Sequence, residues 1–141
     1  MPYREKTSWL SLIAIVATFG PYFVVTGAGW VPDAPLPNLT QMGMFATAAV
    51  VQMLILGGGY LYLARATPGE ARMPPDERDR EIMYRARTIA YYVLISGTIV
   101  VGCVMPFVST GWKIVNATVF MIALAEVVQY GLIIGSYRWQ A

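Results

Sequence analysis

Residues 42–64 read MGMFATAAVVQMLILGGGYLYLA, a run without a single charged side chain. A helix that spans a bilayer needs roughly 20 mainly apolar residues, so this run predicts a transmembrane helix. Three further apolar runs, 9–25, 88–108 and 114–137, predict three more. The runs are continuous rather than alternating, which excludes the strands of a membrane barrel. The sequence therefore predicts an all-α integral membrane protein with one transmembrane domain of four helices over 1–141.

The overall composition agrees with this prediction. The chain is 57% hydrophobic and 13% charged, and its mean hydropathy is +0.54. A soluble domain carries about 25% charged residues. The lipid bilayer is therefore the first partner that the sequence predicts, and a soluble globular fold is excluded.

The basic residues predict the orientation of the helices. Arg4 and Lys6 precede the first run, Arg138 follows the last, and most of the other arginines lie in the loop 65–87. Of the 10 basic residues, only Lys113 falls on the other side. Because positively charged loops stay inside the cell, both termini and the loop 65–87 are expected in the cytoplasm.

The chain contains an internal repeat. Residues 48–52 read AAVVQ and residues 125–129 read AEVVQ, and the same offset of 77 positions also matches Tyr60 with Tyr137. We interpret this as two tandem helical hairpins, repeat 1 at about 4–66 and repeat 2 at about 76–141, related by an axis along the membrane normal. Small residues, which let membrane helices approach closely, predict contact faces and an oligomer or a larger complex: Gly57, Gly58, Gly59, Gly131 and Gly135.

Polar side chains inside the predicted spans are the first candidate site. Glu126 lies near the middle of the fourth helix, where a charge costs on the order of 2.5–3.5 kcal/mol. Its expected neighbours are Gln129 and Tyr130 on the same helix and Gln52 on the second. Three hypotheses stay open: a structural hydrogen bond to Gln52 or Gln129, a proton- or cation-binding carboxylate of a transporter or channel, and a contact with another subunit or a cofactor of a larger complex.

The most charged stretch, DERDREIMYRAR at 76–87, is the second candidate site. We expect Asp76 to cap a helix that enters the bilayer near Thr88, with ion pairs Asp76–Arg80 and Glu81–Arg85 at helical spacing. Its arginines suit either anionic lipid or a cytoplasmic protein. The docking candidates are Asp76, Glu77, Arg78, Asp79, Arg80, Glu81, Arg85 and Arg87.

Two stretches resemble a known family. The Asp-Glu-Arg-Asp start at 76–79, with Ile82, the Arg-x-Arg at 85–87 and Ile-Ala-Tyr-Tyr at 89–92, is similar to small four-helix inner-membrane proteins of bacteria whose function is unknown. The opening REKTSWLSLIAIVATFGPYF at 4–23 resembles the first helix of related proteobacterial proteins. Members of such families are often encoded beside small helix-turn-helix regulators. The resemblance implies a multi-pass protein of the bacterial inner membrane, and it permits a membrane-anchored regulatory role.

Residue types limit the chemistry. The chain has no histidine and one cysteine, Cys103, so we expect no metal site, no cofactor and no catalytic residues. A net charge of +2 without a basic patch argues against direct nucleic-acid binding. We therefore predict a non-enzymatic binding, regulatory or anchoring protein that acts through 65–87, and a cytoplasmic regulatory protein is the candidate partner. The alternatives are a small proton-coupled transporter or channel using Glu126 and an accessory subunit of a larger membrane complex.

Overall fold

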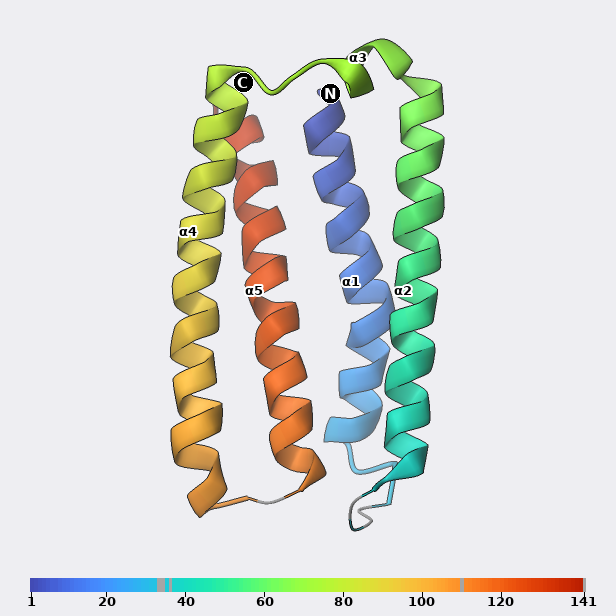
Figure 1. Ribbon diagram of the computed structural model, residues 1–141, viewed down its shortest axis with the longest axis vertical. Coiled ribbons are helices and arrows are strands. Elements are labelled where there is room, and N and C mark those ends of the chain that lie inside the picture. Colours follow the sequence, from blue (N-terminus) through green and yellow to red (C-terminus); the bar gives the residue numbers. More distant parts are fainter. Residues whose placement is uncertain (33–34, 36, 110, 141) are drawn as a thin grey trace.

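The chain folds into four long helices that stand side by side (Figure 1). The computed structural model describes residues 1–32, 35, 37–109 and 111–140. The long helices are α1 (Tyr3–Gly27), α2 (Leu39–Ala66), α4 (Glu77–Ile99) and α5 (Trp112–Trp139), and a short helix, α3 (Pro68–Arg72), links α2 to α4. A π-helical turn (Val100–Val104) and a 3-10 turn (Met105–Phe107) prolong α4. All four long helices are long and apolar enough to cross a membrane, which confirms the all-helical prediction and gives four candidate membrane spans.

Each helix is longer than the apolar run that predicted it. The largest extension is at α4, which begins at Glu77, so much of the predicted loop 65–87 is helical. The carboxylate of Asp76 accepts a hydrogen bond of 2.7 Å from the backbone N–H of Asp79, which confirms the predicted cap. The charged start of α4 is therefore a rigid continuation of a membrane-spanning helix.

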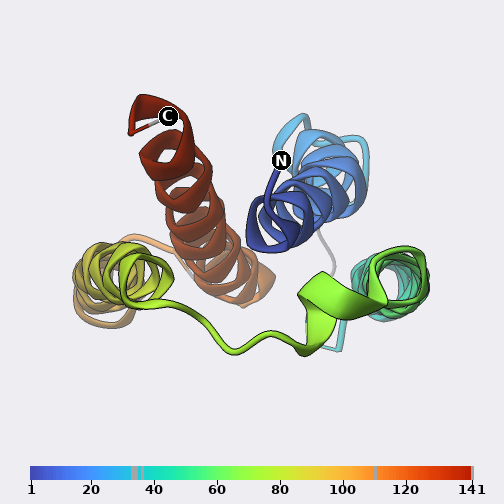
Figure 2. The ribbon, with the colours of Figure 1, turned by 90° about the horizontal axis from the view of Figure 1, so that it is seen from above.

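The helices form an arc in the order α2, α1, α5, α4 (Figure 2). The α1 helix packs against both α2 and α5, and α5 also packs against α4. In the described part of the chain, α2 and α4 make no comparable contact. Both termini, α3 and the start of α4 lie at one end of the arc, which we call the charged end (Figure 1).

The central position of α1 follows from its small polar residues. Ser8, Ser11 and Thr18 lie on one buried face of the helix. Their hydroxyl groups donate to the backbone carbonyl one turn earlier, at 2.8, 3.0 and 2.7 Å, so their burial leaves no unpaired donor. Small, satisfied side chains let two neighbouring helices approach closely. The outer helix α2, in contrast, buries only Gln41 among its residues.

The α4–α5 pair holds the main apolar core. Ile82 and Ala86 of α4 pack against Ile133 and Tyr137 of α5 near the charged end. Further along, α4 and α5 meet so closely at Gly97 that a Cβ atom there would lie 2.1 Å from Cε of Met121.

Within the single chain, one of the predicted glycine contact faces meets a neighbouring helix. Of those glycines, only Gly59 meets a neighbour, since its Cβ would lie 2.5 Å from Cδ2 of Leu10. Gly57, Gly58, Gly131 and Gly135 all face open space in the single chain. The second close approach uses Gly97, which lies in a stretch that carried no small-residue motif.

Candidate functional site

Hydrogen bonds inside the spans tie α1 to α2 and α5. Near the middle, the Thr18 hydroxyl shares its one proton between the Ala14 carbonyl and Oε1 of Gln52, each at 2.7 Å. Towards the charged end, the hydroxyl groups of Ser11 and Tyr60 lie 2.5 Å apart. Gln52, a predicted site residue, therefore has a structural partner within its own hairpin.

A third polar cluster lies at the opposite end of the bundle. The Tyr22 hydroxyl donates to Oδ1 of Asn116, and Nδ2 of Asn116 donates to Oε1 of Gln41 at 3.0 Å. Gln41 also donates its backbone N–H to Oδ1 of Asn38, the cap of α2. Sequence reasoning missed Asn116, although a lone asparagine in an apolar run was a signal for an internal polar contact.

Glu126 has a different environment from Gln52. Its side chain is exposed on the single chain. Among the described residues it forms no ion pair and no hydrogen bond, so the expected hydrogen bonds to Gln52 and Gln129 are not formed. It lies one helical turn from Tyr130 and interacts electrostatically with the hydroxyl of that tyrosine. The structure thus brings Glu126 and Tyr130 together, whereas neither forms a hydrogen bond with Gln52, which meets Thr18.

Tyr130 and Gln129 line a cavity that all four long helices share. It has a volume of about 140 Å³ and lies towards the charged end. We call it the four-helix cavity, and its polar lining comprises Arg4, Thr7 and Ser8 of α1, Tyr60 of α2, Arg87 of α4, and Gln129 and Tyr130 of α5. The Tyr130 hydroxyl interacts there with Ser11 and, over a longer range, with Tyr60 and Arg87. Sequence reasoning found three of these residues but did not predict that they meet.

Part of the predicted docking motif is used to hold the fold. Asp79 pairs with Nε of Arg4 at 3.2 Å and accepts a hydrogen bond from the Tyr137 hydroxyl, so it joins α4 to α1 and α5. Its side chain is only 19% exposed. Next to it, Nε of Arg78 donates to Oε1 of Gln140 at 3.2 Å. Asp76, Arg78 and Asp79 are therefore structural members of the motif.

Two more ion pairs stabilise the charged end. Glu5, 7% exposed, pairs with Nε of Arg138 at 3.5 Å, and the Arg138 guanidinium lies over the Trp9 ring. Lys6 of α1 reaches Glu70 of α3 at 3.9 Å. These contacts hold the start of α1, the end of α5 and the short helix α3 together at the charged end.

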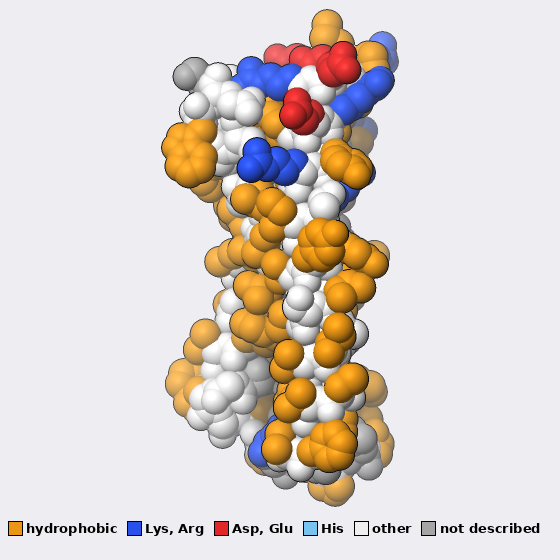
Figure 3. Space-filling model, turned by 90° about the vertical axis from the view of Figure 1, so that its left-hand side faces the viewer, with side chains coloured by type: hydrophobic (Ala, Val, Ile, Leu, Met, Phe, Trp, Pro, Cys, Tyr) orange, Lys and Arg blue, Asp and Glu red, His pale blue; other side chains and the backbone are white. Residues whose placement is uncertain are grey.

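The other motif residues remain available. The predicted pairs Asp76–Arg80 and Glu81–Arg85 are wrong, because neither forms within 4 Å. Glu77, Arg80 and Glu81 instead line a shallow hollow of about 590 Å³ together with Met83, Tyr84 and Arg87, which we call the α4 hollow. Tyr84 is 76% exposed. Figure 3 shows charged side chains of both signs gathered at this end, next to a mainly apolar surface.

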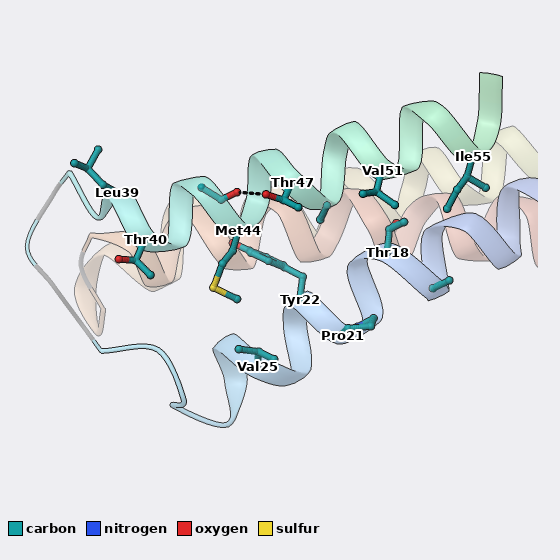
Figure 4. A pocket seen from close by; sticks show the side chains of 13 residues that line it. Thr18, Pro21, Tyr22, Val25, Leu39, Thr40, Met44, Thr47, Val51 and Ile55 are labelled. Atoms are coloured by element: carbon teal, nitrogen blue, oxygen red, sulfur yellow. Dashed lines mark hydrogen bonds between the residues drawn. The ribbon is translucent and has the colours of Figure 1, made fainter. Parts of the chain in front are cut away.

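An apolar crevice of about 720 Å³ separates α1 from α2 in the other half of the bundle (Figure 4). Pro21, Tyr22, Val51 and Ile55 are among its lining residues. The Thr47 hydroxyl at its wall donates to the Gly43 carbonyl of its own helix at 2.8 Å. With no charged lining residue, the crevice offers shape and apolar surface but no reactive group.

Metal binding finds no support within the described ranges, where no three His, Cys, Asp or Glu side chains gather. Comparison with known proteins gives no match to a family model, a curated protein or a solved structure. The resemblance of 4–23 and 76–92 to small bacterial inner-membrane proteins stays a prediction.

Proposed function

We propose that this chain is a membrane-anchored binding protein that presents the start of α4 to a cytoplasmic protein. The charged end carries nine of the 10 basic residues, since Lys113 alone lies elsewhere, and the positive-inside rule supports a cytoplasmic location for it. The bacterial inner membrane fits the resemblance of the charged motif. On this proposal the four spans anchor the chain and α4 carries the binding surface.

The main support for this proposal is that some residues of the charged motif have partners within the chain and others have none among the described residues. Asp76, Arg78 and Asp79 have partners within the chain, whereas Glu77, Arg80, Glu81 and Arg85 form no ion pair with any described residue. Charges of alternating sign on a rigid surface favour a partner with the complementary pattern. Because α4 is already fixed, binding would cost little additional ordering of the backbone.

A charge swap tests this proposal. Exchanging the two charges in the double variant Arg80→Glu, Glu81→Arg keeps the net charge and inverts the pattern of the α4 hollow. After affinity purification in native lipid, this variant should lose the cytoplasmic protein that the unchanged chain retains. Arg65→Glu, an exposed residue outside the hollow, is the control and should retain it. Retention of every cytoplasmic partner by the swapped variant would refute the docking role.

One observation favours a second function, a proton-binding carboxylate in a small transporter. Glu126 is exposed in mid-span and has no hydrogen-bond or ion-pair partner among the described residues. Ionisable groups in membrane helices mark ion and proton pathways. Proton flux into proteoliposomes that Glu126→Gln abolishes and Gln52→Leu leaves intact would support this function. Equal flux in Glu126→Gln and in the unchanged protein would contradict it.

The same exposure supports an oligomer or a larger complex. A charged side chain facing lipid at the centre of a span costs on the order of 2.5–3.5 kcal/mol, and a neighbouring subunit would remove that cost. Chemical cross-linking in native membranes, followed by mass determination, separates a homo-oligomer from an accessory subunit of another complex.

The tandem repeat bears on how the proposed binding surface of the second hairpin arose. Gln52 and Gln129 occupy matching positions, as do Tyr60 and Tyr137. Their partners differ, because Tyr60 meets Ser11 whereas Tyr137 meets Asp79. We propose that the two hairpins arose by duplication and that the second has since acquired the binding residues.

A further inference from the structure

We propose that the four-helix cavity binds a phosphate group, supplied by an anionic phospholipid at the charged end of the bundle. The four-helix cavity shares Met83 and Arg87 with the α4 hollow, but the inference does not depend on a protein partner. It draws on the position, charge, donors and size of the cavity.

The position of the cavity matches the depth of lipid headgroups. Arg87 immediately precedes Thr88, where the apolar run of α4 begins, and Arg4 lies in the first turn of α1. Both guanidinium groups are therefore at the boundary between a membrane-spanning segment and the polar end. Basic clefts between membrane helices at this depth bind the headgroups of anionic lipids.

The charge of the lining favours an anion. Two arginines line the cavity and no acidic residue does. Arg4 is partly neutralised by Asp79 at 3.2 Å, outside the lining. Arg87, by contrast, has no ion-pair partner within the described ranges. At least one uncompensated positive charge therefore faces the cavity.

The free donors of the cavity come from two neighbouring helices, α4 and α5. Ser8 cannot contribute its proton, because it donates to the Arg4 carbonyl at 2.8 Å. Available donors are the Arg87 guanidinium, the Gln129 amide, which bonds to no described residue, and the Tyr130 hydroxyl, which also meets Ser11. A tetrahedral phosphate can accept from several directions at once, and arginine binds it through paired, charge-assisted hydrogen bonds.

The size of the cavity limits what enters. A volume of about 140 Å³ corresponds to a few water molecules at about 30 Å³ each. That space fits a phosphate group but excludes acyl chains, which would stay in the surrounding bilayer. An anionic phospholipid meets both conditions, since its phosphate is polar and its chains are already in the membrane.

The experiment is native mass spectrometry of the full chain in detergent, with phosphatidylglycerol and phosphatidylcholine of identical acyl chains as probes. The unchanged protein should retain one phosphatidylglycerol in preference to phosphatidylcholine. Arg87→Gln should lower the affinity for phosphatidylglycerol by about fivefold or more. The matched control is Arg85→Gln, an exposed arginine on the same helix that does not line the cavity, and it should stay within about twofold.

A second variant keeps the test independent of surface charge. Tyr130→Phe removes one hydroxyl from the cavity without changing any charge, and it should weaken binding by a smaller factor of about threefold. It also replaces Arg87→Gln if circular dichroism shows that the arginine variant does not fold. Equal losses in Arg85→Gln and Arg87→Gln, or equal affinity for the two lipids, would overturn the proposal.

The source of the phosphate is tested separately with inorganic phosphate alone. If millimolar inorganic phosphate fails to displace phosphatidylglycerol, the lipid is the source, as proposed. If it displaces the lipid and its binding depends on Arg87, the lipid source is overturned and a free phosphate takes its place.

Discussion

The two hairpins use matching residues in different ways. In the first, α1–α2, the repeated Gln52 and Tyr60 both bond to hydroxyl groups of α1, so their polar atoms stabilise the fold. In the second, α4–α5, an apolar core around Ile133 and a tie between Tyr137 and Asp79 hold the helices together. Gln129 and its neighbour Glu126 form no hydrogen bond with any described residue. The comparison teaches that a hairpin held together by apolar packing and one polar tie can leave other polar side chains, Gln129 and Glu126, without a hydrogen bond to any described residue.

Removing Asp79, which joins α4 to α1 and α5, should have the largest effect on the free energy of unfolding. Asp79→Ala removes the partner of both Arg4 and Tyr137, and hydrogen bonds to charged groups contribute about 1.5–3 kcal/mol each. Because the pair is partly exposed, we expect a loss of about 2 kcal/mol in the free energy of unfolding. Glu81→Ala, an exposed acid on the same helix without an ion pair, is the control and should change the free energy by less than about 0.5 kcal/mol. Denaturing-detergent titration measures both, and equal losses would contradict the structural role of Asp79.

The second-largest loss of stability is expected from a larger side chain at Gly97, where α4 and α5 lie closest. Gly97→Val places new atoms where Met121 already lies, and inserted methyl groups cost about 1–3 kcal/mol in a packed contact. Because the end of the Met121 side chain can move, we expect about 1.5 kcal/mol, measured by the same titration. Gly131→Val on α5 faces open space and should cost less than half as much. A larger loss from Gly131→Val would show that an unseen partner covers that face.

The matched tyrosines give a finer comparison. Tyr137→Phe removes a hydrogen bond to a carboxylate, and we expect it to cost about 1.5 kcal/mol. Tyr60→Phe removes a bond to the Ser11 hydroxyl, which should cost about 0.6 kcal/mol, as is typical between membrane helices. Unfolding of the two variants side by side checks the order. The reverse order would mean that the first hairpin, not the second, has the stronger polar tie.

Sequence patterns predicted the elements of this fold better than their arrangement. The long apolar runs predicted all four helices, and Asp76 was a recognisable cap. The order α2, α1, α5, α4 was not predictable, because apolar helices present similar surfaces on every side. The buried hydroxyl face of α1, with Ser11 and Thr18, was the one available signal for a central helix.

The sequence predicted which residues belong to the candidate sites, but it did not predict which residues they pair with. Local spacing favoured Asp76–Arg80, whereas the folded chain pairs Asp79 with Arg4, 75 positions earlier. A local rule cannot anticipate such a contact, since it depends on how the chain termini pack. Glu126 was singled out by its residue type, but its expected hydrogen bond to Gln52 does not form, and that amide meets Thr18 instead.

The most direct test of the division between hairpins is the pair Gln52→Leu and Gln129→Leu. Both remove the same amide from matching positions, and equilibrium unfolding in mixed micelles measures each against the unchanged chain. We predict a loss of about 0.6–1 kcal/mol for Gln52→Leu, since Thr18 loses its bond to α2 and keeps only the Ala14 carbonyl. Gln129→Leu should leave the free energy of unfolding within about 0.3 kcal/mol of its original value, because no described residue bonds to that amide. An equal or larger loss for Gln129→Leu would contradict the claim that the second hairpin keeps its polar side chains for binding.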